Sequence, residues 1–126
     1  MPHNIPLIRS VYEQITQHPE THYQASWFEC IAGWAIRLHN RDWAILTHAQ
    51  GIQTINLRTG EIRWTDAVAA ELLGFEPEEA AGIFGASDRM ARDWLEDIIV
   101  AYEMRELDLL ASGFDPDEYP VSEVRG

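Results

Sequence analysis

The chain has 126 residues, of which 46% are hydrophobic and 10% aromatic, and a formal net charge of −12. This length fits one domain with one core, and the composition excludes a disordered chain. No apolar run reaches the roughly 20 residues that span a membrane. The N-terminal sequence MPHNIPLIRS lacks the basic and apolar regions of a secretory signal, and the single cysteine cannot form an internal disulfide. We therefore expect a cytoplasmic protein.

The first predicted element is a helix that begins after Asn4, a good N-cap residue, and ends before Pro19. Pro6 falls in its first turn, where a backbone N–H has no helical partner to lose. Apolar residues recur at the three-to-four spacing of one helical face: Ile8, Val11, Tyr12 and Ile15.

A second helix is predicted to begin at the sequence SWFE, residues 26–29, which has the form of a capping box, with THYQ at 21–24 as a rival start. One broad stripe carries its apolar residues: Trp27, Cys30, Ile31, Trp34, Ala35 and Leu38. On this stripe Cys30 is predicted to be buried and unreactive, because a nucleophilic thiol needs a basic partner and partial exposure. Gly33 costs a helix interior about 1 kcal/mol relative to alanine. We therefore expect another backbone segment or a tryptophan ring to approach it closely.

Residues 55–64 have the alternating pattern of a β-hairpin around Thr59-Gly60. The preceding DWAILTH is either a short third strand or the end of the second helix. An isolated two-stranded hairpin is marginal in water, so this one must pack on the helices. The pattern predicts that it does so through Ile55, Leu57, Ile62 and Trp64.

Three further helices follow: AVAAELL after a cap at Asp66, PEEAAGIF from Pro77, and a long helix that begins at Ser87 or Asp88 and ends at Gly113. The long helix carries several apolar residues on one side: Met90, Trp94, Ile98, Ala101, Tyr102 and Leu109. The fold predicted from these elements is a mostly helical α+β single domain, residues 1–113, with four or five helices and a small β-hairpin. Residues 114–126 form an acidic C-terminal tail.

Specific catalytic signatures are absent from the sequence. There is no phosphate-binding loop, no dinucleotide-binding glycine pattern and no Gly-x-Ser-x-Gly, and the histidines match no zinc-binding spacing. The segment 66–84 has the helix–turn–helix order of a DNA reader, but it carries no cation, so binding of nucleic acid through it is unfavourable. We therefore predict no catalytic residue, metal site, cofactor or direct nucleic-acid contact, and no membrane contact.

Charge separates the chain into two unlike halves. Residues 1–63 hold five acids and five arginines, whereas residues 64–126 hold sixteen acids and four arginines, and the chain has no lysine. Such a distribution attracts a basic protein surface and repels nucleic acid and anionic membrane. The acidic residues predicted to form the interaction face are Glu76, Glu78, Glu79, Asp93, Glu96, Asp97, Glu103, Glu106, Asp108, Asp115, Asp117 and Glu118.

Three segments carry a resemblance to a known group of proteins: WFECIAGWA at 27–35, AAELLGF at 69–75 and EAAGIF at 79–84. Together they resemble small actinobacterial and actinophage proteins without an assigned activity, over about residues 18–100. The residues that carry this resemblance are of the packing type: Trp27, Cys30, Ala32, Gly33, Leu72, Leu73, Gly74 and Phe84. Relatives often have another cysteine, in a Cys-Gly-Thr run shortly before the position of Cys30, where this chain has ASWFE. The resemblance implies a shared fold and supplies no catalytic residues.

Two hypotheses of function follow. The first is a non-enzymatic module whose acidic residues dock on a basic protein surface, in a sharper version as a phage-type inhibitor that imitates the charge of nucleic acid. The second is an enzyme or small-ligand binder with a pocket between the hairpin and the second helix, walled by Trp34, Trp43 and Trp64. Sequence leaves self-association open.

Overall fold

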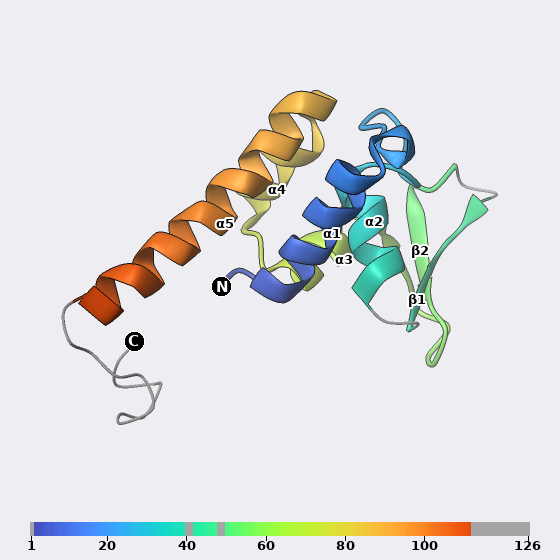
Figure 1. The fold of residues 1–126 in the computed structure, drawn as a ribbon. Helices are drawn as coiled ribbons and strands as arrows, with labels where there is room; N and C mark the ends of the chain where they lie inside the picture. Colours follow the sequence, from blue (N-terminus) through green and yellow to red (C-terminus); the bar gives the residue numbers. More distant parts are fainter. Residues whose placement is uncertain (1, 40–41, 48–49, 112–126) are drawn as a thin grey trace.

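The computed structural model describes residues 2–39, 42–47 and 50–111, which form α-helices, a short 3₁₀-helix at Pro19–Thr21 and an antiparallel sheet (Figure 1). The helices are α1 (Ile5–Gln17), α2 (Ile31–His39), α3 (Thr65–Leu73), α4 (Pro77–Phe84) and α5 (Asp88–Ala111). The strands are β1 (Trp43–Ile45), β2 (Gln53–Asn56) and β3 (Ile62–Trp64), in the order β1-β2-β3. This is the predicted α+β fold with five α-helices. In the described ranges no helix has the length and apolar character needed to cross a bilayer.

Asn4 caps α1, as predicted, and also ties it to the end of α3. Its side-chain oxygen accepts a hydrogen bond from the Leu7 N–H at 3.3 Å. Its own backbone N–H donates to the Leu73 carbonyl at 2.8 Å, and its side-chain amide donates to the Leu72 carbonyl at 2.9 Å. The N-terminal segment is therefore held against a helix nearly 70 residues away.

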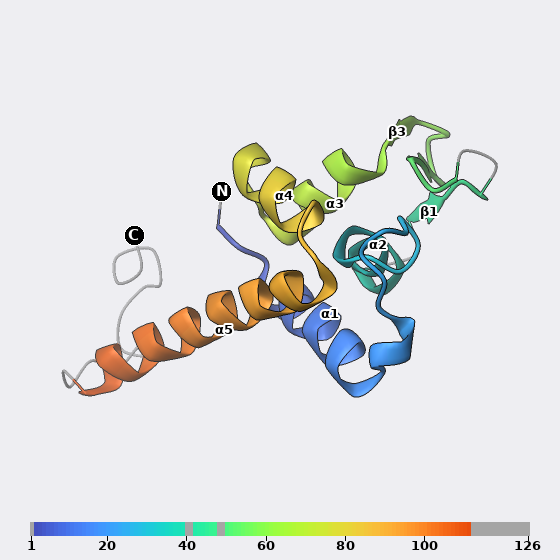
Figure 2. The same cartoon turned by 90° about the horizontal axis from the view of Figure 1, so that it is seen from above.

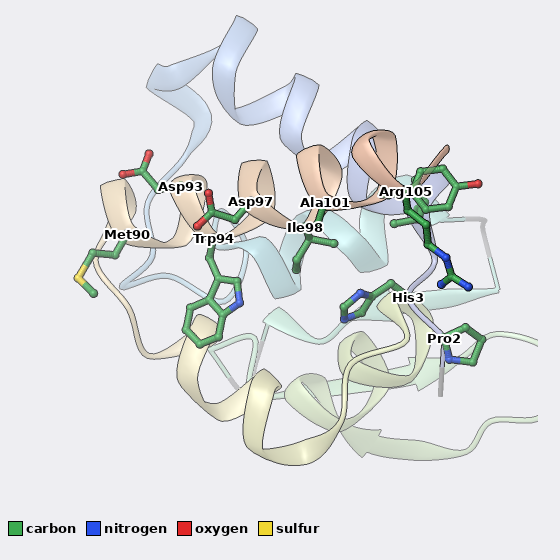
Figure 3. Close-up of a pocket in the computed structure, with 11 residues that line it drawn as sticks. Pro2, His3, Met90, Asp93, Trp94, Asp97, Ile98, Ala101 and Arg105 are labelled. Carbon is green, nitrogen blue, oxygen red and sulfur yellow. The ribbon is translucent and has the colours of Figure 1, made fainter. Parts of the chain in front are cut away.

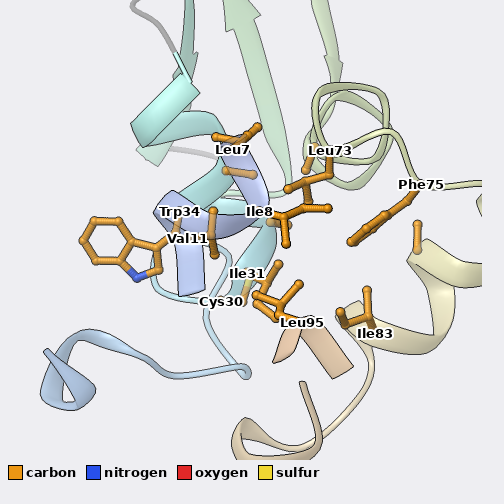
Figure 4. Close-up of a cluster of buried hydrophobic side chains, with 14 of the residues drawn as sticks. Leu7, Ile8, Val11, Cys30, Ile31, Trp34, Leu73, Phe75, Ile83 and Leu95 are labelled. Atoms are coloured by element: carbon orange, nitrogen blue, oxygen red, sulfur yellow. The ribbon is translucent and has the colours of Figure 1, made fainter. Parts of the chain in front are cut away.

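The core lies where α1, α2 and α3 meet, and α4 and α5 close it with a few side chains each (Figure 4). Its largest fully buried apolar side chains are Ile8, Val11, Ile15, Ile31, Ile36, Val68, Leu73, Ile83 and Leu95. Burying a side chain of this size contributes about 1.5–3 kcal/mol.

The start predicted for the second helix at Ser26 is wrong. The Ser26 hydroxyl accepts a hydrogen bond from the Phe28 N–H instead of forming a capping box with Glu29, and residues 23–30 form turns. The rival start at 21–24 is also wrong, because α2 begins at Ile31, whose N–H donates to the side-chain oxygen of Gln24 at 2.8 Å. A side chain seven residues earlier in the sequence thus satisfies a helix-end donor that has no partner within the helix.

Cys30 lies in the core, as predicted, immediately before α2. It is buried, and burial raises the pKa of its thiol above the usual value, although neighbouring backbone N–H groups oppose this rise. Its sulfur accepts a hydrogen bond from the Gly33 N–H at 3.4 Å. Cys30 therefore fills space and also satisfies a donor in the first turn of the helix.

The close backbone approach expected at Gly33 is confirmed. A Cβ atom built on Gly33 would overlap the carbonyl oxygen of Trp27 and lie 2.6 Å from that of Phe28. Only a residue without a side chain lets this backbone cross α2 so closely.

The predicted hairpin forms, and DWAILTH supplies a third strand to it, but the predicted inner face of the sheet is wrong. The side chains of Leu57, Ile62 and Trp64 are more than half exposed. The fully buried side chain of β2 is Thr54, whose hydroxyl lies 2.8 Å from that of Thr65. Alternation identifies the residues that share a face, and here a hydrogen-bonded threonine pair decides which face is inward.

Helix α5 extends beyond the rest of the fold (Figures 1 and 2). It is capped by Ser87, one of the two predicted caps, whose hydroxyl accepts from the Met90 N–H at 3.3 Å. Only Ala91 and Leu95, both in its first third, are buried. The predicted end at Gly113 and the predicted tail lie outside the described residues.

Candidate functional site

The main candidate site is a cleft of about 840 Å³ between the N-terminal segment and α5, here called the α5 cleft (Figure 3). Residues 2–5 form one side, and a long stripe of α5 forms the other. Its lining residues are Pro2, His3, Ile5, Met90, Asp93, Trp94, Asp97, Ile98, Ala101, Tyr102 and Arg105.

The α5 side of the cleft is one continuous helical face. The lining residues between Met90 and Arg105 are adjacent or lie three or four positions apart, which places them on one side of the helix. At a rise of 1.5 Å per residue, this face is about 22 Å long. Five of the six apolar residues predicted to share one side of the helix therefore line this open cleft, and only Leu109 does not.

The opposite side is held in place by His3. Its Nε2 lies 2.8 Å from a carboxylate oxygen of Glu79, and its ring stands edge-on to Phe75 with centroids 5.5 Å apart. Farther along the cleft, the Trp94 ring packs on Gly82 of α4, where an added Cβ would lie 2.7 Å from the ring. The cleft is therefore built from segments far apart in sequence, and hydrogen bonds and ring packing hold these segments together.

Charge is distributed unevenly along the cleft. Asp93 and Asp97 lie one helical turn apart in the half of the stripe that begins at Met90, whereas Arg105 lies at its opposite end. Asp93 is 3.8 Å from the guanidinium of Arg89, a pair with both side chains exposed. Exposed pairs of this kind contribute little, so Asp93 retains most of its capacity to bind a partner.

The predicted acidic face is only partly gathered at this cleft. Asp93 and Asp97 line it, and Glu79 supports it through His3. Glu103 pairs with Arg9 of α1 at 3.3 Å, and Glu96 lies beside the Tyr12 hydroxyl. Glu76 and Glu78 begin α4, Glu106 and Asp108 lie on the outer part of α5, and Asp115, Asp117 and Glu118 are outside the described residues. Of the described members of this face, Glu78, Glu96, Asp97 and Asp108 make no ion pair.

A second groove, of about 560 Å³, lies between α3 and α4. Its lining is apolar and aromatic, with Trp27, Phe75 and Phe84 among its residues, and Asp66 and Glu71 at its rim. Glu71 accepts two hydrogen bonds from the Arg63 guanidinium, at 2.6 and 2.8 Å, which lowers the pKa of its carboxyl group. This rim carboxylate is therefore already engaged.

The three tryptophans predicted to wall a pocket do not come together. Trp34 is buried, with its indole N–H donating to the Thr21 carbonyl at 2.9 Å. Trp43 pairs with Asn56 of β2, and Trp64 pairs with Gln53. Asn56 and Gln53 are three positions apart on one strand, so their side chains, and those of the tryptophans paired with them, point to opposite faces of the sheet. The pocket predicted between the hairpin and the second helix does not have these walls.

Sequence reasoning missed the N-terminal side of the cleft. The apolar stripe of α5 was visible in the sequence, but nothing in the local pattern around His3 indicates that it reaches Glu79, 76 residues later. In the sequence, Arg105 stands out only as one of the few cations of the acidic half.

The described ranges bring together no group of three histidine, cysteine, aspartate or glutamate side chains that could hold a metal ion. No protein family, curated protein or solved structure matches the chain. The resemblance to small actinobacterial and actinophage proteins stays a prediction.

Proposed function

We propose that this protein is a non-enzymatic interaction module that binds a basic, amphipathic helical segment of a partner protein in the α5 cleft. The observation that carries the proposal is the continuous stripe on α5 along an open cleft, which carries apolar side chains over its length and two aspartates, Asp93 and Asp97, in the half that begins at Met90. Helices commonly bind in grooves through apolar residues at this spacing.

The length of the cleft favours a polypeptide. A stripe of about 22 Å corresponds to four turns of a partner helix, so several successive side chains can pack against it. Ile5, Trp94, Ile98 and Ala101 supply the apolar contacts. An apolar stripe of a partner helix, spaced by three and four residues, would lie between them.

Charge favours a basic partner. Between residues 64 and 111 there are twelve carboxylates and three arginines, and Asp93 and Asp97 stand at the edge of the cleft. A cationic segment is attracted to this field before contact and then pairs with the two aspartates.

In its sharper form, the proposal makes the partner a protein whose basic surface otherwise binds nucleic acid. The excess of carboxylates along α3, α4 and α5 supports this form, because it offers an array of negative charge to such a surface. Double-stranded DNA should then compete with the module for a partner captured from host lysate. Equal recovery of that partner at about 50 and about 500 mM salt would count against an electrostatic contact.

The direct test uses a synthetic helical peptide with leucines at heptad positions and lysines on the flanks. Binding is measured by fluorescence anisotropy at about 50 mM salt, with a glutamate-flanked peptide as the comparison. We expect the lysine peptide to bind at least tenfold more tightly, because the cleft edge is acidic. Equal binding of the two peptides would contradict the proposal.

Two variants of equal charge locate the contact. Asp93→Asn with Asp97→Asn should weaken binding of the lysine peptide about tenfold. Glu78→Gln with Asp108→Asn removes the same charge outside the cleft lining and should change binding less than threefold. Equal losses in both double variants would place the contact elsewhere. An Ala101→Arg variant, which fills the cleft, should abolish binding at either salt concentration.

A further inference from the structure

One row of lining residues on α5 carries opposite charges at its two ends. Residues at successive intervals of four all line the α5 cleft: Asp93, Asp97, Ala101 and Arg105. We call these four residues the charged row. At a rise of 1.5 Å per residue, neighbours in the row are about 6 Å apart along the helix, and Arg105 lies about 12 Å beyond Asp97. The row therefore presents two negative charges, then an uncharged position, then a positive charge.

The charged row crosses the face of the helix as it advances. Because an α-helix has 3.6 residues per turn, each step of four residues turns the row by about 40°. The two carboxylates thus stand at one edge of the stripe, whereas Arg105 lies nearer its middle, with its side chain directed toward Pro2 (Figure 3). A segment that lies along the cleft meets the two kinds of charge at different points of its length.

Arg105 is available to bind a carboxylate. It is exposed and makes no ion pair with another described residue. The other basic side chain in the described lining is His3, whose Nε2 already lies 2.8 Å from a carboxylate oxygen of Glu79. A guanidinium group binds a carboxylate through two parallel hydrogen bonds, which makes the pairing specific in geometry as well as in charge.

We propose that Arg105 determines the specificity of the α5 cleft by selecting a partner helix that is basic at one end and has an acidic side chain about two turns farther along. The inference rests on the proposed function, in which the basic residues pair with Asp93 and Asp97. A segment that is basic along its whole length would place a cation against Arg105, and like charges in contact lower affinity. The cleft thereby distinguishes a segment with separated charges from a uniformly basic one.

Two peptides of identical composition test this selection. Both have the same leucine stripe, two lysines one turn apart and blocked ends, and they differ only in the position of one glutamate. In the far isomer the glutamate lies two turns beyond the second lysine, opposite Arg105, whereas in the near isomer it lies one turn beyond, opposite Ala101. Because their net charges are equal, the field of the acidic chain attracts both alike. Each isomer is made in both chain directions, since either direction can align the charges.

Binding is measured by fluorescence anisotropy at about 50 mM salt, and the readout is the ratio of the two dissociation constants in the direction that binds more tightly. We expect the far isomer to bind about fivefold more tightly than the near isomer, and Arg105→Gln to reduce this ratio below about twofold. Arg58→Gln is the matched control, because it removes the same charge from an exposed arginine of the hairpin that does not line the cleft. It should leave the ratio unchanged.

The aspartates provide a second control. Asp93→Asn with Asp97→Asn should weaken both isomers alike and preserve the ratio, because the lysines are common to the two peptides. Equal binding of the isomers, a ratio that persists in Arg105→Gln, or a ratio that falls as much in Arg58→Gln would overturn the role of Arg105 and leave the proposed function standing. Binding of neither isomer would overturn the proposed function and this inference together.

Discussion

Helices α1 and α5 lie against each other but use their apolar residues differently. Four of the 13 residues of α1 are buried, whereas the 24-residue α5 buries only two. Trp94, Ile98 and Ile99 are partly buried against the core, and most other apolar residues of α5 line the cleft or face solvent, as Val100, Met104 and Leu110 do. A helix that exposes so much apolar surface on a highly charged chain is poorly explained by stability alone. The comparison assigns α1 to the core and α5 to binding.

The largest test of this comparison exchanges an apolar side chain for alanine on each helix. Ile8→Ala in α1 empties a fully buried site and should lower the free energy of unfolding by about 2–4 kcal/mol. Met90→Ala in α5 alters an exposed side chain at the cleft and should change the free energy of unfolding by less than about 0.5 kcal/mol. Urea unfolding followed by circular dichroism measures both. Similar losses for the two variants would break the distinction.

A second pair compares two glycines, one packed in the core and one beside the cleft. Gly33→Ala should lower the free energy of unfolding by about 1–3 kcal/mol, because its Cβ would strike backbone carbonyls of Trp27 and Phe28. Gly82→Ala meets only the end of the Trp94 ring, which faces the open cleft and can shift. Helix propensity then favours the alanine by up to about 1 kcal/mol.

The same unfolding curves measure this pair, and tryptophan fluorescence reports the displaced Trp94 ring. If Gly82→Ala were as destabilising as Gly33→Ala, the cleft side of α5 would be as tightly packed as the core. The assignment of α5 to binding would then lose its structural basis.

Local chemistry in the sequence was enough to predict much of the fold. The Asn4 cap, the glycine in α2 with its close backbone contact and the strand alternation were all correct, since each depends on residues a few positions apart. The start of α2 was not predictable, because the Gln24 side chain, rather than the capping box at Ser26, satisfies the Ile31 N–H.

The candidate site was less predictable because it depends on contacts between distant segments. The apolar stripe of α5 was visible, but its exposure follows from where α1 begins and where His3 meets Glu79. The inward face of the sheet depends on Thr54 meeting Thr65, a pair that hydrophobic patterning ranks below Ile62 and Trp64. Patterning identifies shared faces, and the tertiary contacts decide which face is covered.

A smaller test concerns the ion pair that joins α1 and α5. Glu103→Gln removes the contact with Arg9 at 3.3 Å, and both side chains are more than 40% exposed. We expect a loss of at most about 0.5 kcal/mol, because exposed pairs are well solvated. A double-mutant cycle with Arg9→Met isolates the pair. A coupling free energy above about 1.5 kcal/mol would mean that α5 is held to α1 more strongly than its exposure indicates.

The smallest effect is expected from Tyr12, where α1 meets Glu96 of α5. Burial first, and then the Glu96 carboxylate, raise the pKa of its hydroxyl above the ordinary value of about 10. The folded chain holds this proton more tightly than the unfolded chain does. The contribution of Tyr12 to stability is therefore complete below its ordinary pKa and is lost as the pH rises through the raised pKa. Tyr12→Phe removes the titrating group, so its stability should fall less steeply above pH 10 than that of the unchanged protein. Urea midpoints at pH 8 and 11 measure the difference, and the other tyrosines are common to both chains. Parallel pH dependence in the two proteins would mean that Glu96 does not lie against α1, and that α5 stands free over more of its length than the structure shows.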